Sequence, residues 1–424
     1  MLIRFIGPTL AALAVLAAAV LAARTYAPFG LRVSVGMALG AASIAAMGIA
    51  LILSARPTWI ESLFGGLDRM YRVHKWLGVA ALVLMVGHDA IEPDLGKVVH
   101  ETWLGKFAQD VGELAFNGFI ALVLLSWFKR IPFTRLELPW PIWKFTHRFT
   151  GVLFAAAAFH QLLVDKPDSL DPLLGSYLNI LSLAGLAAWL FTQLIAHRWR
   201  GHTFVLETIK TRGAVTEIVL RAEGRALKWQ AGQFAFVSAP EAGMNEPHPF
   251  TIASASNDDG RITFCIKGLG RWTRLLPAKL EVGQRLRVEG PYGRFLFRKR
   301  ARRQVWVAGG IGITPFLAWA EALRADDTQE IALFWAVSSR VDAFAADRLL
   351  AVTASHPSFK LHVRVSDTAG RLTARALSRL TPFHVKSSEL FFCGPAGLLD
   401  TLVSGLNELG QGPQRIHHET FELR

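Results

Sequence analysis

The chain has 424 residues and a formal net charge of +13 at pH 7, and 52% of its residues are hydrophobic. This length predicts more than one domain, and with only two cysteines, Cys265 and Cys393, a framework of several disulfides is excluded. The positive charge forms no basic stripe interleaved with aromatic residues, so we expect no nucleic-acid partner; much of it flanks long apolar runs, as in membrane proteins.

Six segments in the first half are apolar enough to cross a lipid bilayer, which requires roughly 20 apolar residues per helix. They are residues 5–23, 33–55, 71–90, 111–128, 143–164 and 172–196. The first segment also resembles a signal peptide. Its apolar run is longer than a typical signal core, so we expect a retained helix.

The charges of the loops predict the orientation of these spans, because Lys and Arg concentrate on the cytoplasmic side of membrane proteins. Basic residues lie beside two alternate loops and after the last span: Arg56, Arg69, Arg72, Lys75, Lys129, Arg130, Arg135, Lys144, Arg148, Arg198 and Arg200. Acidic residues lie beside the other loops: Asp89, Glu92, Asp94, Glu101, Asp165, Asp168 and Asp171. We therefore expect the C-terminal half to be cytoplasmic, in a chain of the bacterial inner (plasma) membrane.

Two of the predicted spans carry two histidines each. His74 and His88 lie 14 residues apart on the third span, and His147 and His160 lie 13 residues apart on the fifth. Both spans run in the same direction, so His74 pairs in depth with His147 near the cytoplasm, and His88 pairs with His160 near the outside. Ionisable groups inside a bilayer are costly and therefore usually functional. Two levels of paired imidazoles, roughly 20 Å apart, predict two b-type haems.

Other interpretations of the histidines remain open. Each could be hydrogen-bonded singly within the bundle, and a zinc or copper site would need ligands much closer than roughly 20 Å. A step of 13 residues also leaves His160 rotated away from the helix face of His147. The fifth span must therefore tilt or contain a local irregularity if both histidines point to one neighbour.

Three further residues of the membrane half are candidates for roles around the haems. Phe154 lies midway between His147 and His160, where it would serve as an inter-haem relay or as ordinary packing. Arg72 and Arg148 lie near the inner level and could neutralise haem propionates. The alternative is that both arginines are only positive anchors at the cytoplasmic face.

After residue 198 the sequence is typical of water-soluble domains. Short alternating strands separated by Gly and Pro predict an antiparallel β-barrel, and strands alternating with helices then predict a parallel nucleotide-binding sheet. The predicted fold is therefore a membrane all-α six-helix bundle in residues 1–198, an antiparallel barrel in residues 199–300 and an α/β domain in residues 301–424.

Four short motifs in these domains can bind cofactors. Residues 248–254 read His-Pro-Phe-Thr-Ile-Ala-Ser after a barrel strand, and residues 268–273 read Gly-Leu-Gly-Arg-Trp-Thr before a helix. Backbone N–H groups at a helix start, together with an arginine, can hold a diphosphate. Residues 309–315 read Gly-Gly-Ile-Gly-Ile-Thr-Pro between a strand and a helix, and residues 391–397 read Phe-Phe-Cys-Gly-Pro-Ala-Gly.

The order of these motifs resembles the ferredoxin–NADP reductase module. Joined to a six-helix domain with four histidines, it resembles the NADPH oxidase and ferric reductase superfamily over nearly the whole chain. The resemblance implies that FAD is bound by His248, Pro249, Phe250, Thr251, Gly268, Arg271, Trp272 and Thr273, with Phe421 covering the flavin. It implies that NADPH is bound by Gly310, Gly312, Thr314 and Pro315 at its pyrophosphate and by Cys393, Gly394 and Pro395 beside the nicotinamide.

A preference for NADPH over NADH is expected from an arginine after the second strand of the sheet. Residues 338–340 read Ser-Ser-Arg, and Ser338 and Arg340 are both candidate NADPH-binding residues. Arg340 can bind a 2′-phosphate, and Arg371 is a second candidate for that role. A solvated surface arginine is the alternative interpretation.

The expected function is electron transfer from cytoplasmic NADPH, with FAD and two b-type haems, to an acceptor outside. The acceptor is O₂, giving superoxide, or a ferric chelate; we favour O₂, although Glu92 occupies the position where oxygen-reducing eukaryotic relatives have a further histidine. Two alternatives are delivery of electrons to a quinone or partner membrane protein, and a haem-free transporter or sensor.

Overall fold

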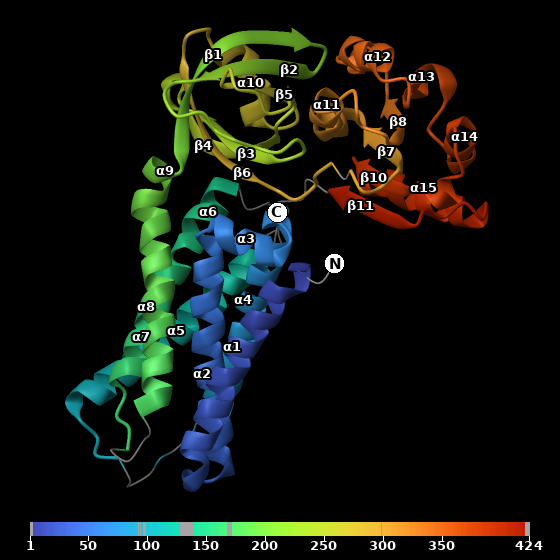
Figure 1. Ribbon diagram of the computed structural model, residues 1–424. Coiled ribbons are helices and arrows are strands. Elements are labelled where there is room, and N and C mark those ends of the chain that lie inside the picture. The colour runs from blue at the N-terminus through green and yellow to red at the C-terminus, as the bar shows by residue number, and fades with distance from the viewer. Residues whose placement is uncertain are drawn as a thin grey trace. The chain divides into compact units, whose positions relative to one another are not determined.

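The computed structural model describes residues 3–91, 93, 95, 99–127, 140–167, 172–297 and 299–419. The chain divides into two compact units, Met1–Trp199 and Arg200–Arg424 (Figure 1). The first unit is helical, and the second contains the β-sheets.

The first unit is a helical bundle in which α2 contacts α1, α4 and α8. Its described elements are α1 (Ile3–Tyr26), η1 (Ala27–Phe29), α2 (Leu31–Ser54), α3 (Thr58–Phe64), α4 (Leu67–Ile91), α5 (Trp103–Trp127), α6 (Trp140–Arg148), α7 (Thr150–Leu163), α8 (Pro172–Leu190), the π-helical η3 (Phe191–Ile195) and α9 (Ala196–Trp199). Small residues permit close helix contacts, as is usual in membranes. A Cβ added at Gly48 of α2 would lie 2.9 Å from the carbonyl oxygen of Leu181 on α8.

Four of the described helical segments are long and apolar enough to cross a membrane: Phe5–Phe29, Leu31–Ser54, Trp103–Leu125 and Pro172–Ile195. The third and fifth predicted spans are helical too, as α4 and as α6 with α7. These helices are not among those that are both long enough and apolar enough to cross a membrane. Helix α4 contains five charged residues besides its two histidines, and the fifth span is divided into two shorter helices. The count of six spans therefore stays a prediction.

In the second unit, the described strands β1–β6 form an antiparallel sheet in the order β4-β3-β6-β1-β2-β5. Its elements are β1 (Gly201–Arg212), β2 (Val215–Ala222), β3 (Phe234–Ala239), η4 (Pro240–Ala242), β4 (Met244–Thr251), β5 (Arg261–Lys267), α10 (Arg271–Lys279) and β6 (Arg285–Tyr292). A bridge between Ile252 and Phe264 brings the chain after β4 beside β5, although these strands are the two edges of the sheet. This closes the sheet into the predicted barrel.

The described strands β7–β11 form a parallel sheet in the order β11-β10-β7-β8-β9. Its elements are β7 (Arg303–Gly309), η5 (Gly310–Ile313), α11 (Thr314–Glu321), β8 (Glu330–Val337), η6 (Arg340–Asp342), α12 (Ala346–Ser355), β9 (Phe359–Val365), α13 (Ser366–Ala369), α14 (Ala374–Leu380), η7 (Val385–Ser387), β10 (Glu389–Cys393), α15 (Ala396–Glu408) and β11 (Arg415–Glu419). The strand order changes direction between β7 and β10. Ligands of open α/β sheets bind at such a switch point.

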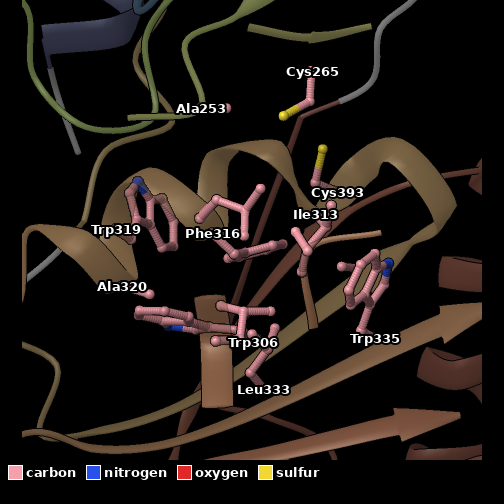
Figure 2. Close-up of a cluster of buried hydrophobic side chains, with 14 of the residues drawn as sticks. Ala253, Cys265, Trp306, Ile313, Phe316, Trp319, Ala320, Leu333, Trp335 and Cys393 are labelled. Atoms are coloured by element: carbon pink, nitrogen blue, oxygen red, sulfur yellow. The ribbon is translucent and has the colours of Figure 1, made fainter. Parts of the chain in front are cut away.

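The barrel and the parallel sheet share a hydrophobic core. Ala253 and Cys265 of the barrel belong to the same buried cluster as Trp306, Phe316 and Trp319 of the α/β part. Figure 2 shows these aromatic rings together below the two barrel residues. The ring centroids of Trp306 and Trp319 lie 5.1 Å apart in an edge-to-face arrangement, which favours a defined packing.

Candidate functional site

The predicted inner pair of histidines faces one apolar hollow. The ring centroids of His74 on α4 and His147 on α6 lie 6.3 Å apart. An imidazole nitrogen binds a transition metal at about 2 Å, so one ion between these rings can be reached by both. The hollow contains about 580 Å³ of empty space, counting the part that is open, and its other lining residues include Met47, Leu82 and Phe119. A large, largely hydrocarbon ligand with one metal ion suits this lining.

Three of the four histidines are oriented by backbone carbonyls of neighbouring helices. The Nδ1 atom of His74 lies 2.8 Å from Ala50 O, that of His88 lies 2.8 Å from Gly36 O, and that of His160 lies 3.0 Å from Ala108 O. A carbonyl oxygen only accepts hydrogen bonds, so each Nδ1 is the protonated nitrogen. The Nε2 lone pair is then available to a metal, as in most histidine-ligated sites.

These hydrogen bonds keep the histidines in two levels. On α2, the acceptors Gly36 and Ala50 lie 14 residues apart, which is also the separation of His74 and His88 on α4. The earlier acceptor binds the later histidine, so the two helices run antiparallel. His160 on α7 is close enough to His88 to interact with it electrostatically. The predicted pairing by depth agrees with this arrangement.

The fifth predicted span contains a local irregularity, one of the two possibilities that the spacing of His147 and His160 left. Helix α6 ends at Arg148 and α7 begins at Thr150. The N–H of Phe149 bonds to Thr146 O, three residues back, and the Thr150 hydroxyl donates to His147 O at 2.7 Å. A three-residue turn winds the chain more tightly than an α-helix, which rotates His160 toward the face of His147.

The other candidates of the membrane half differ in their surroundings. Phe154 is fully buried and lines the same hollow as His74 and His147, which suits either of its predicted roles. Arg72 is largely exposed and forms an ion pair with Asp68 at 3.2 Å, whereas Arg148 is exposed. Their role at haem propionates stays a prediction.

Sequence reasoning missed Trp143, which stacks on the ring of His147. Their centroids lie 4.8 Å apart and their planes differ by 11°. The two residues are four positions apart on α6, so helix periodicity was the available signal. The carbonyls of Gly36, Ala50 and Ala108 had no such signal, because every residue has one.

Haem fits the residues present. Within the described parts of the chain no group of three or more His, Cys, Asp or Glu side chains is placed to hold a bare metal ion. A haem would need two histidine ligands from the protein, and the paired histidines, three of which have an available Nε2 atom, would supply them.

The predicted flavin residues come together around Trp272. His248, Pro249, Phe250 and Thr251 are the last four residues of β4, and Trp272 lies in the first turn of α10. The ring of Trp272 lies 4.7 Å from that of His248 and 5.5 Å from that of Phe250. Within the described structure, Thr251 Oγ1 and Trp272 Nε1 are buried without a hydrogen-bond partner. Buried polar atoms of this kind usually have a partner, so a bound FAD that supplies one fits this site.

The start of α10 uses some of its own polar groups. Thr273 Oγ1 accepts from the N–H groups of Leu269 and Gly270, each at 3.0 Å. These two N–H groups were among those expected to face a diphosphate. Arg271 remains exposed at the helix start, and the N–H of Gly268 bonds to Ala214 O. Arg271 is therefore the better supported of the predicted diphosphate contacts.

The predicted NADPH loops meet at the switch point of the parallel sheet. A Cβ added at Gly312 would lie 2.1 Å from Cys393 O, so only glycine allows η5 to approach the end of β10 this closely. Gly310 has a positive φ of 55° and open space beside it. Thr314 and Pro315 are buried, and the Thr314 hydroxyl donates to Ile311 O. Of the four predicted pyrophosphate residues, Gly310 has the open surroundings that a ligand needs.

The predicted nicotinamide residues follow β10. Cys393 is fully buried, and burial raises the pKa of its thiol well above the usual value. Figure 2 shows its side chain beside Ile313. Gly394 is half-buried and Pro395 is exposed, so these two are the accessible members of the trio.

The residues expected at a 2′-phosphate lie after β8. Arg340 is exposed in η6, and Arg371 is exposed after α13. The N–H of Asp367 bonds to Ser338 O, which holds the segment before Arg371 beside the end of β8. Phe421, the residue expected to cover the flavin, lies outside the described residues.

Comparison with known proteins identifies three parts of the chain. Residues 39–158 match the ferric reductase like transmembrane component, residues 202–295 match an FAD-binding domain, and residues 306–403 match the oxidoreductase NAD-binding domain. A solved structure, the flavohaem-like FAD/NAD-binding domain of nitric oxide dioxygenase from Vibrio cholerae, is similar over 52% of this chain and 99% of that chain, with a TM-score of 0.45 and 23% identity.

Two curated relatives show the range of similar proteins. The chain is 24% identical over 237 residues to the anthranilate 1,2-dioxygenase electron transfer component of Acinetobacter baylyi, covering 51% of this chain and 68% of that protein. It is 30% identical over 179 residues to NADPH oxidase 1 of Mus musculus, covering 38% of this chain and 29% of that protein. The chain covers between 29% and 60% of the length of seven curated relatives, NADPH oxidase 1 among them. The chain belongs to the NADPH oxidase and ferric reductase superfamily, with a ferric-reductase-like transmembrane component joined to FAD-binding and NAD-binding oxidoreductase domains.

Proposed function

We propose that the chain is a transmembrane oxidoreductase that takes electrons from cytoplasmic NADPH and passes them to a one-electron acceptor on the other side of the membrane, with FAD and two b-type haems as cofactors. Oxygen, giving superoxide, is the acceptor we favour. The observation that carries the proposal is the orientation of His74, His88 and His160, whose Nδ1 atoms are held by carbonyls so that each Nε2 is available to a metal.

The cofactors supply the electron chemistry: a flavin accepts a hydride and releases its electrons singly, and haem iron carries one electron. The chain's own residues bind and orient. His74 with His147 would hold the inner haem, and His88 with His160 the outer one. Apolar residues around the first pair, including the fully buried Phe154, would keep water from the inner haem.

In the second unit, the chain would hold the flavin and the nucleotide at neighbouring strand ends. Thr251 Oγ1 and Trp272 Nε1 would bond to FAD, since both are buried polar atoms without a described partner. Gly310 would let the pyrophosphate of NADPH approach the backbone at the switch point of the sheet. Arg340 would contact the 2′-phosphate.

The orientation belongs to the same proposal. Basic residues beside the loops around Arg72 and Arg148 support a cytoplasmic location for that side of the helical unit. The NAD-binding domain needs a compartment that contains reduced nucleotide, which agrees with a cytoplasmic second unit. The proposed location is the inner membrane of a bacterium, with six spans.

The test is an assay of the purified full chain, loaded with FAD and haem and supplied with NADPH. Dye reduction that superoxide dismutase abolishes is compared with reduction of a ferric chelate without oxygen. We expect NADPH oxidation with predominant superoxide formation. Faster ferric reduction would identify a ferric-chelate reductase, and NADPH-dependent haem reduction without turnover of either acceptor would favour delivery to a quinone or protein partner. Absence of haem in a folded, flavin-loaded chain would contradict the proposal.

A further inference from the structure

Two glycines lie directly against the outer pair of histidines. Gly40 on α2 faces His88, and a Cβ added there would lie 2.9 Å from His88 Nδ1. Gly112 on α5 faces His160, and a Cβ added there would lie 2.5 Å from Nδ1 and 2.7 Å from Cγ. Contacts below 3.0 Å are essentially never seen for real Cβ atoms, so each ring occupies space that only glycine leaves open.

Each of these glycines lies four residues beyond the carbonyl that orients the same histidine. Gly36 O accepts from His88 and precedes Gly40, and Ala108 O accepts from His160 and precedes Gly112. Residues four apart lie on one face of a helix. The acceptor and the glycine therefore form one flat surface for the imidazole ring, and the arrangement occurs on two separate helix pairs, α2 with α4 and α5 with α7.

The inner level lacks this device. His74 also donates to a carbonyl, that of Ala50, but the residue four positions further along α2 is Ser54. Among the described glycines other than Gly65 and Gly66, a histidine is the nearest obstacle to an added Cβ only at Gly40 and Gly112. The inner and outer levels thus differ in how closely a neighbouring helix approaches the histidine ring.

We propose that Gly40 and Gly112 are positioning residues of the outer haem site, each seating one axial histidine so that its Nδ1 reaches the carbonyl four residues earlier. The proposal rests on the proposed function in taking His88 and His160 as the outer ligands. An alanine at either position displaces the ring and weakens its hydrogen bond to the carbonyl. Loss of such an orienting partner lowers metal-site affinity by about 10–100-fold.

The two positions differ in the expected severity. At Gly112 the added Cβ also meets Cγ, the ring atom attached to the side-chain Cβ, so rotation of the imidazole alone does not relieve the contact. At Gly40 the closest atoms are Nδ1 at 2.9 Å and Cε1 at 3.1 Å, so a small shift suffices. Gly112→Ala should therefore weaken haem binding more than Gly40→Ala.

Two substitutions are matched controls. Gly118 also lies on α5 against α7, and its added Cβ would lie 2.6 Å from Cδ2 of Leu153, the end of a flexible side chain that can move. Gly118→Ala therefore crowds the same helix pair without touching a histidine. Gly175 on α8 has nothing within 4 Å of an added Cβ, so Gly175→Ala reports the effect of the substitution itself.

The experiment measures haem content, low-spin haem spectra and midpoint potentials of the purified full chain and these variants. Spectra of His88→Leu and His74→Leu serve as references for chains without the outer or the inner haem. We expect Gly112→Ala to fall from about two haems per chain to about one and to match His88→Leu, while Gly118→Ala and Gly175→Ala keep both. If Gly112→Ala is not recovered from membranes, Gly40→Ala is tested in its place with the same spectra. The proposal then predicts a shifted midpoint potential for the outer haem and an unchanged one for the inner haem.

Three results would overturn the assignment of the glycines: two low-spin haems with unchanged potentials in Gly112→Ala, loss of both haems in that variant, or an equal loss in Gly118→Ala. A different result identifies failure of the proposed function. If the unmodified chain lacks two low-spin haems, or if His88→Leu keeps both, the histidine ligands are wrong and the role of the glycines falls with them.

Discussion

Buried thiols on both sides of the barrel–sheet contact give a direct test of the second unit at the residue scale. Burial raises the pKa of Cys265 to about 12, and it raises the pKa of Cys393 well above the usual value. The thiolate is the reactive form, and at pH 8 a thiol with a pKa of 12 is ionised in only about one molecule in 10⁴.

We therefore expect neither Cys265 nor Cys393 to react with a maleimide at pH 8 in the folded chain, and both to react in denaturant. Mass spectrometry of intact protein counts the added groups, and Cys393→Ser assigns them. Rapid labelling of Cys393 in the native chain would show that the end of β10 opens, contrary to the packing of Gly312 against Cys393 O.

Arg340 allows a second prediction at this scale. Its exposed guanidinium at the end of β8 can contact a 2′-phosphate, which NADH lacks. Arg340→Ala should raise KM for NADPH by about tenfold or more, equivalent to the loss of one charged hydrogen bond of roughly 1.5–3 kcal/mol. KM for NADH should change little.

Steady-state assays with both nucleotides measure this effect. Arg375→Ala, at an exposed arginine of α14, is the control and should alter neither KM. Equal increases of KM for NADPH and NADH in Arg340→Ala would show that the arginine does not discriminate between them.

At the scale of elements, some features of the helices that carry the histidines could be predicted from the sequence and others could not. The apolar periodicity and the steps of 14 and 13 residues predicted four histidines in two levels, and α4, α6 and α7 carry them. A tilt or an irregularity in the fifth span was predicted, but the position of the break, at Phe149, was not predictable, because no proline or glycine occupies that position. It depends on the Thr150 hydroxyl and the Thr146 carbonyl, which compete with ordinary helix hydrogen bonds.

The contact between barrel and parallel sheet also depends on elements that are distant in sequence. Arg348 on α12 contacts Glu217 of β2 at 3.2 Å, Glu321 of α11, and Ala253 O, which lies two residues after Thr251, the last flavin residue of β4. Glu321 in turn accepts from the N–H of Ala255 at 3.1 Å. These bonds fix the NAD-binding domain to the segment that continues the flavin motif.

Replacing Arg348 should therefore loosen this contact. Arg348→Met leaves Glu217 and Glu321 without their shared cation, and we expect a loss of about 1–2 kcal/mol, reduced by the partial exposure of the three side chains. The release of FAD on heating, followed by flavin fluorescence of the full chain, should occur roughly 2–8 °C lower. The rate of FAD reduction by NADPH should fall as well.

The control for Arg348→Met is Arg285→Met. Arg285 forms a comparable pair with Glu223, at 2.7 Å, but within the barrel and at its surface. It should shift the melting temperature less and leave the rate of FAD reduction unchanged. If both variants behaved alike, Arg348 would be an ordinary surface ion pair.

At the scale of the whole molecule, the order of parts could be predicted because each has its own hydrophobic period. Long apolar runs, then alternation, then strands separated by helices predicted a bundle, a barrel and a parallel sheet, and the structure has them in that order. Contacts between elements inside a part could not be predicted. The bond from His74 to Ala50 O joins residues 24 positions apart, and its acceptor is a backbone atom that no side chain identifies.

In the proposed function, electrons leave the membrane at the level of His88 and His160. The most direct measurement uses the purified His88→Leu chain, supplied with FAD and NADPH, and follows flavin absorbance without oxygen, haem content, and reduction of external acceptors. We predict that NADPH still reduces FAD, that haem content falls from about two to about one per chain, and that external reduction is lost. External reduction at the rate of the unmodified chain would contradict the account.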